Sequence, residues 1–223
     1  MRLEGKTAVF FGGGRTAERK VRKLLERGAL ITVVSRGFTE YLLELGKRGD
    51  IELVEADLDE TALVIPDRIS GAGVVIAATD SPGLNARISQ AAREEGVLVC
   101  AVDMPALSDF YFPAVAQKGS IRVGVCTDGK SPLMSKLIKE KIQAVLTDED
   151  ALGVDLQAYA RGIAKTLILN SGSRRNALYK IAQDPEVQRS LAAGNLPGAK
   201  EIARKIIEEW PLATAESNES KGD

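Results

Sequence analysis

The sequence predicts an α/β fold whose N-terminal half is a doubly wound parallel sheet, followed by a small αβ segment and a helical module. Three observations support this fold class. Short apolar runs alternate with helical stretches as far as about residue 102, which is the pattern of repeated βαβ units. The run at 29–35 is continuously apolar and β-branched, as in a parallel strand covered on both faces. From residue 148 onward the chain is rich in Ala, Lys, Glu and Leu, which favours helices.

The first half of the chain supplies its elements in regular alternation. A strand at 7–11 leads into Gly12-Gly13-Gly14 and then into a helix at 15–27, which ends at Gly28. The apolar residues of that helix share one face at helical period. Ser81-Pro82 supplies an N-cap and an N1 proline for a helix that ends at Gly96. The other expected elements are strands at 29–35, 51–55, 73–78 and 98–102, and helices at 39–47 and 62–69.

The pattern changes after Asp103. Strands at 110–116 and 121–126, joined by residues 117–120, predict a hairpin rather than a crossover. Ser131-Pro132 then opens a helix that runs to about residue 146. We divide the chain into a doubly wound domain at 1–113, a small αβ segment at 114–146 and a helical module at 147–223, whose polar tail frays after about residue 211.

The composition excludes several classes of function. The 223 residues contain 30 Lys and Arg against 31 Asp and Glu, so any binding of anions must be local and nucleic acid is not expected as a partner. Histidine is absent, which removes the commonest general base and zinc ligand, and we expect no metal site. No apolar run approaches the ~20 residues of a membrane span. We expect a cytoplasmic protein with two buried, reduced thiols, Cys100 and Cys126.

The loop after the first strand has the pattern Gly12-x-Gly14-x-x-Ala17. This is the dinucleotide fingerprint of a Rossmann fold, with alanine in its third small position. Gly12 permits the tight turn, Gly14 lets the backbone approach the pyrophosphate, and Ala17 lets the helix pack closely on the strand. The helix N-terminus, at Arg15 and Thr16, then offers free N–H groups to the phosphates.

The second half of the fingerprint is missing. An acidic residue is expected at the end of the second strand, where it would hold the ribose 2′-hydroxyl, and this chain has Ser35-Arg36 there. Arg36 suggests tolerance of a 2′-phosphate and therefore NADP, unless it is a solvated loop residue. The choice between NAD and NADP stays open.

Two aspartates follow strands at the edge where Rossmann ligands bind. Asp103 comes directly after the fifth strand and is the best-placed candidate base in a chain without histidine, although it could equally organise a turn. Asp80 follows the fourth strand and fits either a turn or a position near the cofactor.

The stretch from Gly124 to Ser131 formally matches a phosphate loop, G-x-x-x-x-G-K-S, but Pro132 follows and no partner carboxylate strand appears. A helix N-terminus at Lys130 and Ser131 that binds an acidic substrate or an edge of the cofactor explains the same residues more simply.

Four segments of the chain occur in the same order as the motifs of one known family. They are FFGGGRTAERKVRKLLERGALITVVS, VIAATDSPGLNARISQAAREEGVLVCAVDMP, DFYFPA and DGKSPLMSKLIKEKI. Together they resemble the precorrin-2 dehydrogenase family, which includes the N-terminal part of siroheme synthase and bifunctional dehydrogenase/ferrochelatases. The resemblance covers about residues 1–146.

The resemblance implies a homodimer that oxidises the tetrapyrrole precorrin-2 to sirohydrochlorin with NAD, and in some members inserts Fe²⁺ to give siroheme. It places the key catalytic aspartate at Asp103, the glycine loop at 12–14 and the cofactor-side motif at Thr79 and Asp80. It also implies that 114–146 is a dimerisation segment. The chain departs from the family at Cys100, where asparagine is expected, and most of all in its helical tail. The rival hypotheses are a nucleotide-sensing Rossmann module without catalysis and a different NAD(P) dehydrogenase.

Overall fold

The computed structural model describes residues 3–58 and 64–211. These residues form two compact units, which we describe separately. The first unit comprises residues 1–112 together with 128–130, and the second comprises the remainder, 113–127 and 131–223. The expected segments 114–146 and 147–223 therefore both lie in the second unit, apart from the short piece 128–130. The first two residues of the helix expected at 62–69 and the polar tail after residue 211 lie outside the described residues.

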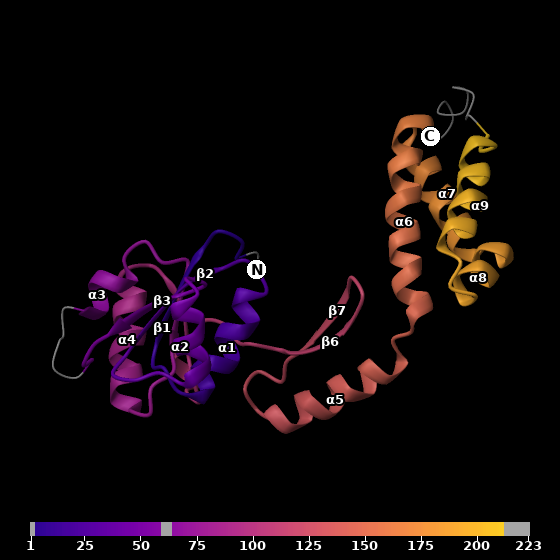
Figure 1. Ribbon diagram of the computed structural model, residues 1–223. Helices are drawn as coiled ribbons and strands as arrows, with labels where there is room; N and C mark the ends of the chain where they lie inside the picture. The colour runs from indigo at the N-terminus through magenta and orange to yellow at the C-terminus, as the bar shows by residue number, and fades with distance from the viewer. Residues whose placement is uncertain (1–2, 59–63, 212–223) are drawn as a thin grey trace, which may run out of the picture. The chain divides into compact units, whose positions relative to one another are not determined.

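A five-stranded parallel sheet forms the centre of the first unit, as the sequence predicted (Figure 1). The strand order is β3-β2-β1-β4-β5, so the chain adds two strands on one side of β1 and then two on the other. The position between β1 and β4 is therefore the topological switch point, where open α/β sheets bind their ligands. The strands are β1 Thr7–Phe11, β2 Leu30–Ser35, β3 Glu52–Glu55, β4 Val74–Ala77 and β5 Leu98–Ala101.

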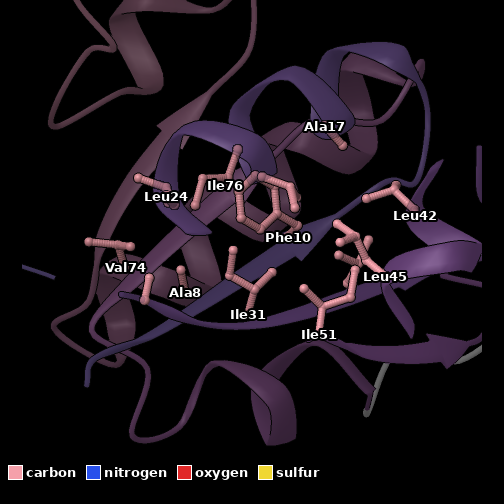
Figure 2. Packing of buried hydrophobic residues seen from close by; sticks show 13 residues of the cluster. Ala8, Phe10, Ala17, Leu24, Ile31, Leu42, Leu45, Ile51, Val74 and Ile76 are labelled. Carbon is pink, nitrogen blue, oxygen red and sulfur yellow. The ribbon is translucent and has the colours of Figure 1, made fainter. Parts of the chain in front are cut away.

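Helices cover both faces of this sheet, because alternate residues of each strand point to opposite faces. Phe10 belongs to the core on one face, which includes Ala17 and Leu24 of the first helix and is shown in Figure 2. Its neighbour Phe11 belongs to the core on the other face, together with Leu84. The helices of this unit are α1 Arg15–Leu25, α2 Glu40–Lys47, α3 Val64–Ile69 and α4 Pro82–Glu94, and a 3₁₀ turn, η1, spans Pro105–Leu107.

The second unit begins with an antiparallel hairpin, which confirms that strands and not a crossover follow the parallel sheet. The expectation for its first strand was wrong in position: residues 110–116 were expected, and β6 is Ala114–Lys118. Phe110 and Phe112 instead pack against the core of the first unit, and Pro113 has no N–H for a ladder hydrogen bond. The partner strand β7 is Ile121–Val125, and Gly119 supplies the positive φ of the turn.

Five helices follow the hairpin in the part of the second unit that the structure describes: α5 Pro132–Val145, α6 Asp148–Leu167, α7 Ser171–Gln183, α8 Pro185–Ala192 and α9 Leu196–Glu208. Helices α6 to α9 share one core, in which small residues of α6 such as Ala160 and Ala164 are fully buried. Small side chains at these positions let neighbouring helices approach closely. None of the helices in the described ranges combines the length and the apolar character needed to cross a bilayer.

The two cysteines differ in their surroundings. Cys100 lies in β5 and is buried, as expected, whereas Cys126 is exposed. The expectation for Cys126 was wrong because the strand that precedes it belongs to a two-stranded sheet, in which β7 alternates between half-buried and exposed residues. A hairpin of two strands cannot cover both faces of a strand, so an apolar run in it does not indicate full burial.

Candidate functional site

A pocket of about 500 Å³ lies in the first unit at the carboxyl ends of β1, β2, β4 and β5. Ten residues that the sequence singled out line it together: the nine expected cofactor residues and the candidate base Asp103. The complete lining is Gly12, Gly13, Gly14, Arg15, Thr16, Ser35, Arg36, Leu58, Ala78, Thr79, Asp80, Ser81, Leu84, Val102 and Asp103.

The two residues expected to bind substrate do not line this pocket. Lys130 belongs to the first unit but is not part of the lining. Ser131 belongs to the second unit, where its hydroxyl accepts a hydrogen bond from the Met134 N–H and caps α5.

The glycine loop forms the floor of the pocket, and each glycine has a separate steric role. Gly12 has φ 108° and lies so close to β4 that a Cβ there would approach the Ala78 carbonyl carbon to 2.7 Å. A Cβ on Gly13 would lie 2.8 Å from Cδ1 of Phe38. A Cβ on Gly14 would meet no atom within 4 Å. The first two glycines are therefore required by the fold itself, whereas Gly14 keeps a space open for a ligand.

The N-terminus of α1 has no side-chain cap, because the N-cap residue is Gly14. Every other α-helix whose N-cap the structure describes is capped by a side chain: α2, α4, α5, α6, α7, α8 and α9. The first N–H groups of α1, from Arg15 onward, therefore face the pocket without the oxygen that the other helices supply for themselves. Free N–H groups and the positive end of the helix dipole together attract phosphate.

A buried asparagine holds the end of β4 in place. Asn85, 4% exposed, lies in the first turn of α4. Its Oδ1 accepts hydrogen bonds from the Thr79 N–H at 3.1 Å and from the Thr79 hydroxyl at 2.7 Å, and its Nδ2 donates to the Thr79 carbonyl at 3.2 Å. Thr79 is therefore fixed through three atoms, and the adjacent Asp80 and Ser81 are presented along one wall of the pocket.

The ends of β2 and β3 supply an ion pair beside the pocket. Nη2 of Arg36 lies 2.6 Å from Oδ1 of Asp57, which follows β3. Parallel strands β2 and β3 end at the same edge of the sheet, and this brings the two residues together although they are 21 positions apart. The positive charge of Arg36 is consequently balanced in part by a carboxylate of the same chain.

Asp103 occupies a backbone conformation that few residues other than glycine adopt, with φ 57°. Aspartate tolerates this left-handed region better than most side chains. The turn is anchored by Ser108, whose hydroxyl accepts from the Ala101 N–H at 3.0 Å and lies 3.1 Å from the Met104 carbonyl oxygen, to which it can donate. Asp103 is exposed, so its carboxylate is held at the pocket wall by its backbone and remains accessible.

A half-buried lysine lies below this turn. The Nζ of Lys20, on α1, lies 4.2 Å from the centre of the Phe112 ring, a cation–π distance. Burial lowers the pKa of Lys20 from its ordinary value, and the thiolate form of Cys100 and the charge of Asp103 oppose that shift. Burial also raises the pKa of the Cys100 thiol, against the opposing charge of Lys20.

The arrangement of these residues fits a dinucleotide. The loop at 12–14 leaves an open position at Gly14, and α1 offers its uncapped N–H groups. From the loop the lining extends to the end of β2 on one side and, on the other, to the ends of β4 and β5, where Asp103 lies. Within residues 3–58 and 64–211, no group of three or more Cys, Asp and Glu side chains is placed to hold a metal ion.

Sequence reasoning missed several residues of this site. Asp57 could have been predicted from the sequence, because a polar residue just after β3 must lie near the residue just after β2. Asn85 gave no signal, because an asparagine inside a helix has no characteristic pattern. The sequence also did not indicate that Lys20 is half-buried and interacts with Cys100 and Asp103.

Comparison with known proteins gives a consistent result. A family model described as "Putative NAD(P)-binding" matches residues 1–114. Siroheme synthase 1 of Aeromonas salmonicida is 31% identical over 218 residues, which is 96% of this chain and 45% of that protein. A siroheme synthase of Escherichia coli is 30% identical over 207 residues, 93% of this chain and 44% of that protein. The chain therefore spans less than half the length of these relatives.

A solved structure titled "SirC, precorrin-2 dehydrogenase" resembles the whole fold. Its TM-score is 0.73 at 21% identity, and the match covers 92% of this chain and 97% of that one. The similarity extends beyond the parallel sheet to the second unit, because the first unit alone could not give that coverage.

Proposed function

We propose a function on the premise that this chain belongs to the NAD(P)-binding family whose model matches residues 1–114, and that siroheme synthases are among its relatives. The function is the NAD-dependent oxidation of precorrin-2 to sirohydrochlorin, a step of siroheme biosynthesis. The single observation that carries this proposal is that Asp103 and the glycine loop at 12–14, which lie 89 or more positions apart in the sequence, line one pocket.

The residues of the pocket divide the work of holding the coenzyme. Gly14 would admit the pyrophosphate, and the N–H groups of Arg15 and Thr16 would donate to its oxygens. Ser35 and Arg36 would hold the adenosine ribose, and Thr79 and Asp80 would hold the nicotinamide side. The nicotinamide, when bound, accepts the hydride that leaves the macrocycle.

Asp103 has the role of base. Oxidation of precorrin-2 removes one hydride and one proton from the macrocycle, and the carboxylate of Asp103 accepts the proton. The left-handed backbone of this residue and the hydroxyl of Ser108 keep the carboxylate at the wall of the pocket. Since the side chain is exposed, the proton can pass on to water after each turnover.

NAD rather than NADP is the preferred coenzyme in this proposal. Arg36 would bind a 2′-phosphate if its charge were available, but it forms an ion pair with Asp57. A 2′-phosphate would have to compete with that carboxylate and would also be repelled by it. The ion pair therefore takes over the discriminating role of the acidic residue that is missing from the end of β2.

The proposal extends to iron insertion and to a homodimer. Fe²⁺ is a substrate of the second reaction, for which the macrocycle supplies four nitrogen ligands and Asp103 can accept the pyrrole protons. Lys130 and Ser131 are proposed to hold substrate carboxylates. The segment 114–146 is the proposed dimerisation segment, since α5 exposes a row of apolar side chains, with Leu133 65% and Val145 71% exposed, as expected of a helix that packs on a partner.

The experiment that tests the function is a spectral assay with the purified protein. Precorrin-2 is incubated with NAD or with NADP, and the conversion of the macrocycle is followed by its absorption. We expect turnover with NAD, slower turnover with NADP, and the loss of both in Asp103→Asn. Absence of any spectral change with either coenzyme would refute the proposed function. Turnover that survives Asp103→Asn would refute the role of the base alone.

A further inference from the structure

The second unit contains a groove of about 520 Å³ between α6 and α7 that the dinucleotide site does not use. Helix α7 follows α6 after a short loop, and the two lie side by side in Figure 1. The groove residues of α6 include Gln157, Arg161 and Lys165, which recur at four-residue intervals and therefore form one stripe on the helix. The groove residues of α7 recur in the same way from Ser171 to Ala182.

The groove has cations and no acids. Its lining includes Arg161, Lys165, Arg174 and Arg175, but no Asp or Glu. This is unusual for a chain whose acidic and basic residues are nearly equal in number. Surface cations are normally interspersed with carboxylates, so four of one sign around one groove create a local positive potential.

Three of these cations have no partner within the described part of the chain. No hydrogen bond or ion pair is formed there by the side chains of Arg161, Lys165 or Arg175. Arg174 is fixed in place, because its Nη1 donates to the carbonyl oxygens of Ile168 at 2.8 Å and Leu169 at 2.7 Å. It thereby satisfies carbonyls at the end of α6 and keeps a guanidinium group at one end of the groove.

The floor between the cations is apolar. It is formed in part by Ala164, Leu178 and Ala182, and Tyr179, which is exposed, lines the groove with them. Gln157 ties the two helices together under the groove, since its Nε2 donates to the Leu178 carbonyl oxygen at 3.2 Å. The floor is consequently defined by packed helices and not by flexible loops.

We propose that this groove is a second anion site, which binds a flat apolar ring that carries several carboxylates. An apolar floor suits the face of a ring, and separate cations along two helices suit carboxylates spread over its edge. A compact phosphate would instead require donors that converge on one point. Naming the ligand as a tetrapyrrole rests on the proposed function. The groove then holds the macrocycle outside the dinucleotide pocket, before or after its oxidation.

The test measures binding of uroporphyrin, a stable tetrapyrrole with eight carboxylates, by the quenching of its fluorescence. The groove variant is Arg161→Glu, Lys165→Glu, Arg175→Glu. The matched control is Lys180→Glu, Arg189→Glu, Lys205→Glu, which reverses three exposed cations of the same unit outside the groove. Circular dichroism establishes that both variants retain their helices. We expect the groove variant to lose one binding site per chain or to bind at least tenfold more weakly, and the control to bind within threefold of the parent.

Several outcomes would overturn the inference. Equal affinity in the parent and the groove variant excludes the groove as the site. Equal weakening in the control shows that only net charge matters. Displacement of uroporphyrin by pyrophosphate at the same concentration identifies a phosphate site instead. The result can be separated from the proposed function. If uroporphyrin binding depends on the groove but precorrin-2 is not oxidised, only the dehydrogenase function is refuted. If precorrin-2 is oxidised but uroporphyrin binding does not depend on the groove, only the groove site is refuted.

Discussion

Replacing Gly14 by alanine should weaken the binding of NAD while changing the free energy of unfolding only slightly. Gly14 has φ −81° and ψ −177°, an extended backbone that alanine adopts without strain, and the added Cβ meets no atom within 4 Å. The only folding cost is that of a poorer N-cap, about 0.5–1 kcal/mol. The same methyl group projects where the pyrophosphate must come into contact with the backbone. We expect the affinity for NAD to fall at least tenfold, which is about 1.4 kcal/mol.

Titration calorimetry with NAD gives the affinity, and urea unfolding without ligand gives the stability. Gly162→Ala is the matched control, because a Cβ at Gly162 in α6 also meets nothing within 4 Å. That substitution should raise the free energy of unfolding by about 0.5–1 kcal/mol, as glycine disfavours a helix interior, and should leave NAD binding unchanged. If Gly14→Ala binds NAD as tightly as the parent, the assignment of this position to the pyrophosphate is wrong.

Four further predictions concern the pocket and the two cysteines. Asp57→Asn releases Arg36 from its ion pair, so the ratio of NADP to NAD affinity should rise by about tenfold, and an unchanged ratio would contradict the role of the pair. Asp103→Asn keeps a side chain that tolerates the left-handed backbone, so kcat should fall by about 100-fold or more while Tm stays constant; a large fall in Tm would show that the aspartate is structural. Cys126 should react with a thiol reagent in the native protein and Cys100 only after unfolding, because burial raises the Cys100 pKa. The stability that this thiol contributes is present below the unfolded-state pKa and is lost as the pH rises above it, so Cys100→Ala should flatten the fall in stability at alkaline pH.

Local patterns in the sequence were sufficient for the parallel sheet. Continuous apolar runs, the glycine loop and the Ser-Pro helix starts each depend on neighbouring residues, so strands β1 to β5 and helices α4 and α5 appear where they were expected. The prediction of a strand at 110–116 was wrong because of tertiary packing. Phe110 and Phe112 pack against the core of the first unit and are not part of the hairpin, so their apolar character did not indicate a strand.

The sequence predicted the pocket residues that follow the parallel strands, but not the side chains that hold those residues in place. Each parallel strand delivers the residue after it to the same edge of the sheet, so Ser35, Thr79 and Asp103 were expected to approach one another. The hydrogen bonds that position these residues come from side chains outside the strand ends. Asn85 and Ser108 act through side chains whose direction depends on the packing of a helix and a turn, and nothing in their local sequence distinguishes them from other polar residues.

If the coenzyme binds as proposed, the uncapped N-terminus of α1 would make it a component of the folded protein as well as a reactant. The phosphates would complete the first turn of a helix that every other α-helix with a described N-cap completes with its own side chain. Occupancy would then add to stability in proportion to the logarithm of ligand concentration, about 2.7 kcal/mol at a hundredfold excess over Kd. A cell short of dinucleotide would thus hold a population that opens more often at this helix and is more readily cleaved by proteases there.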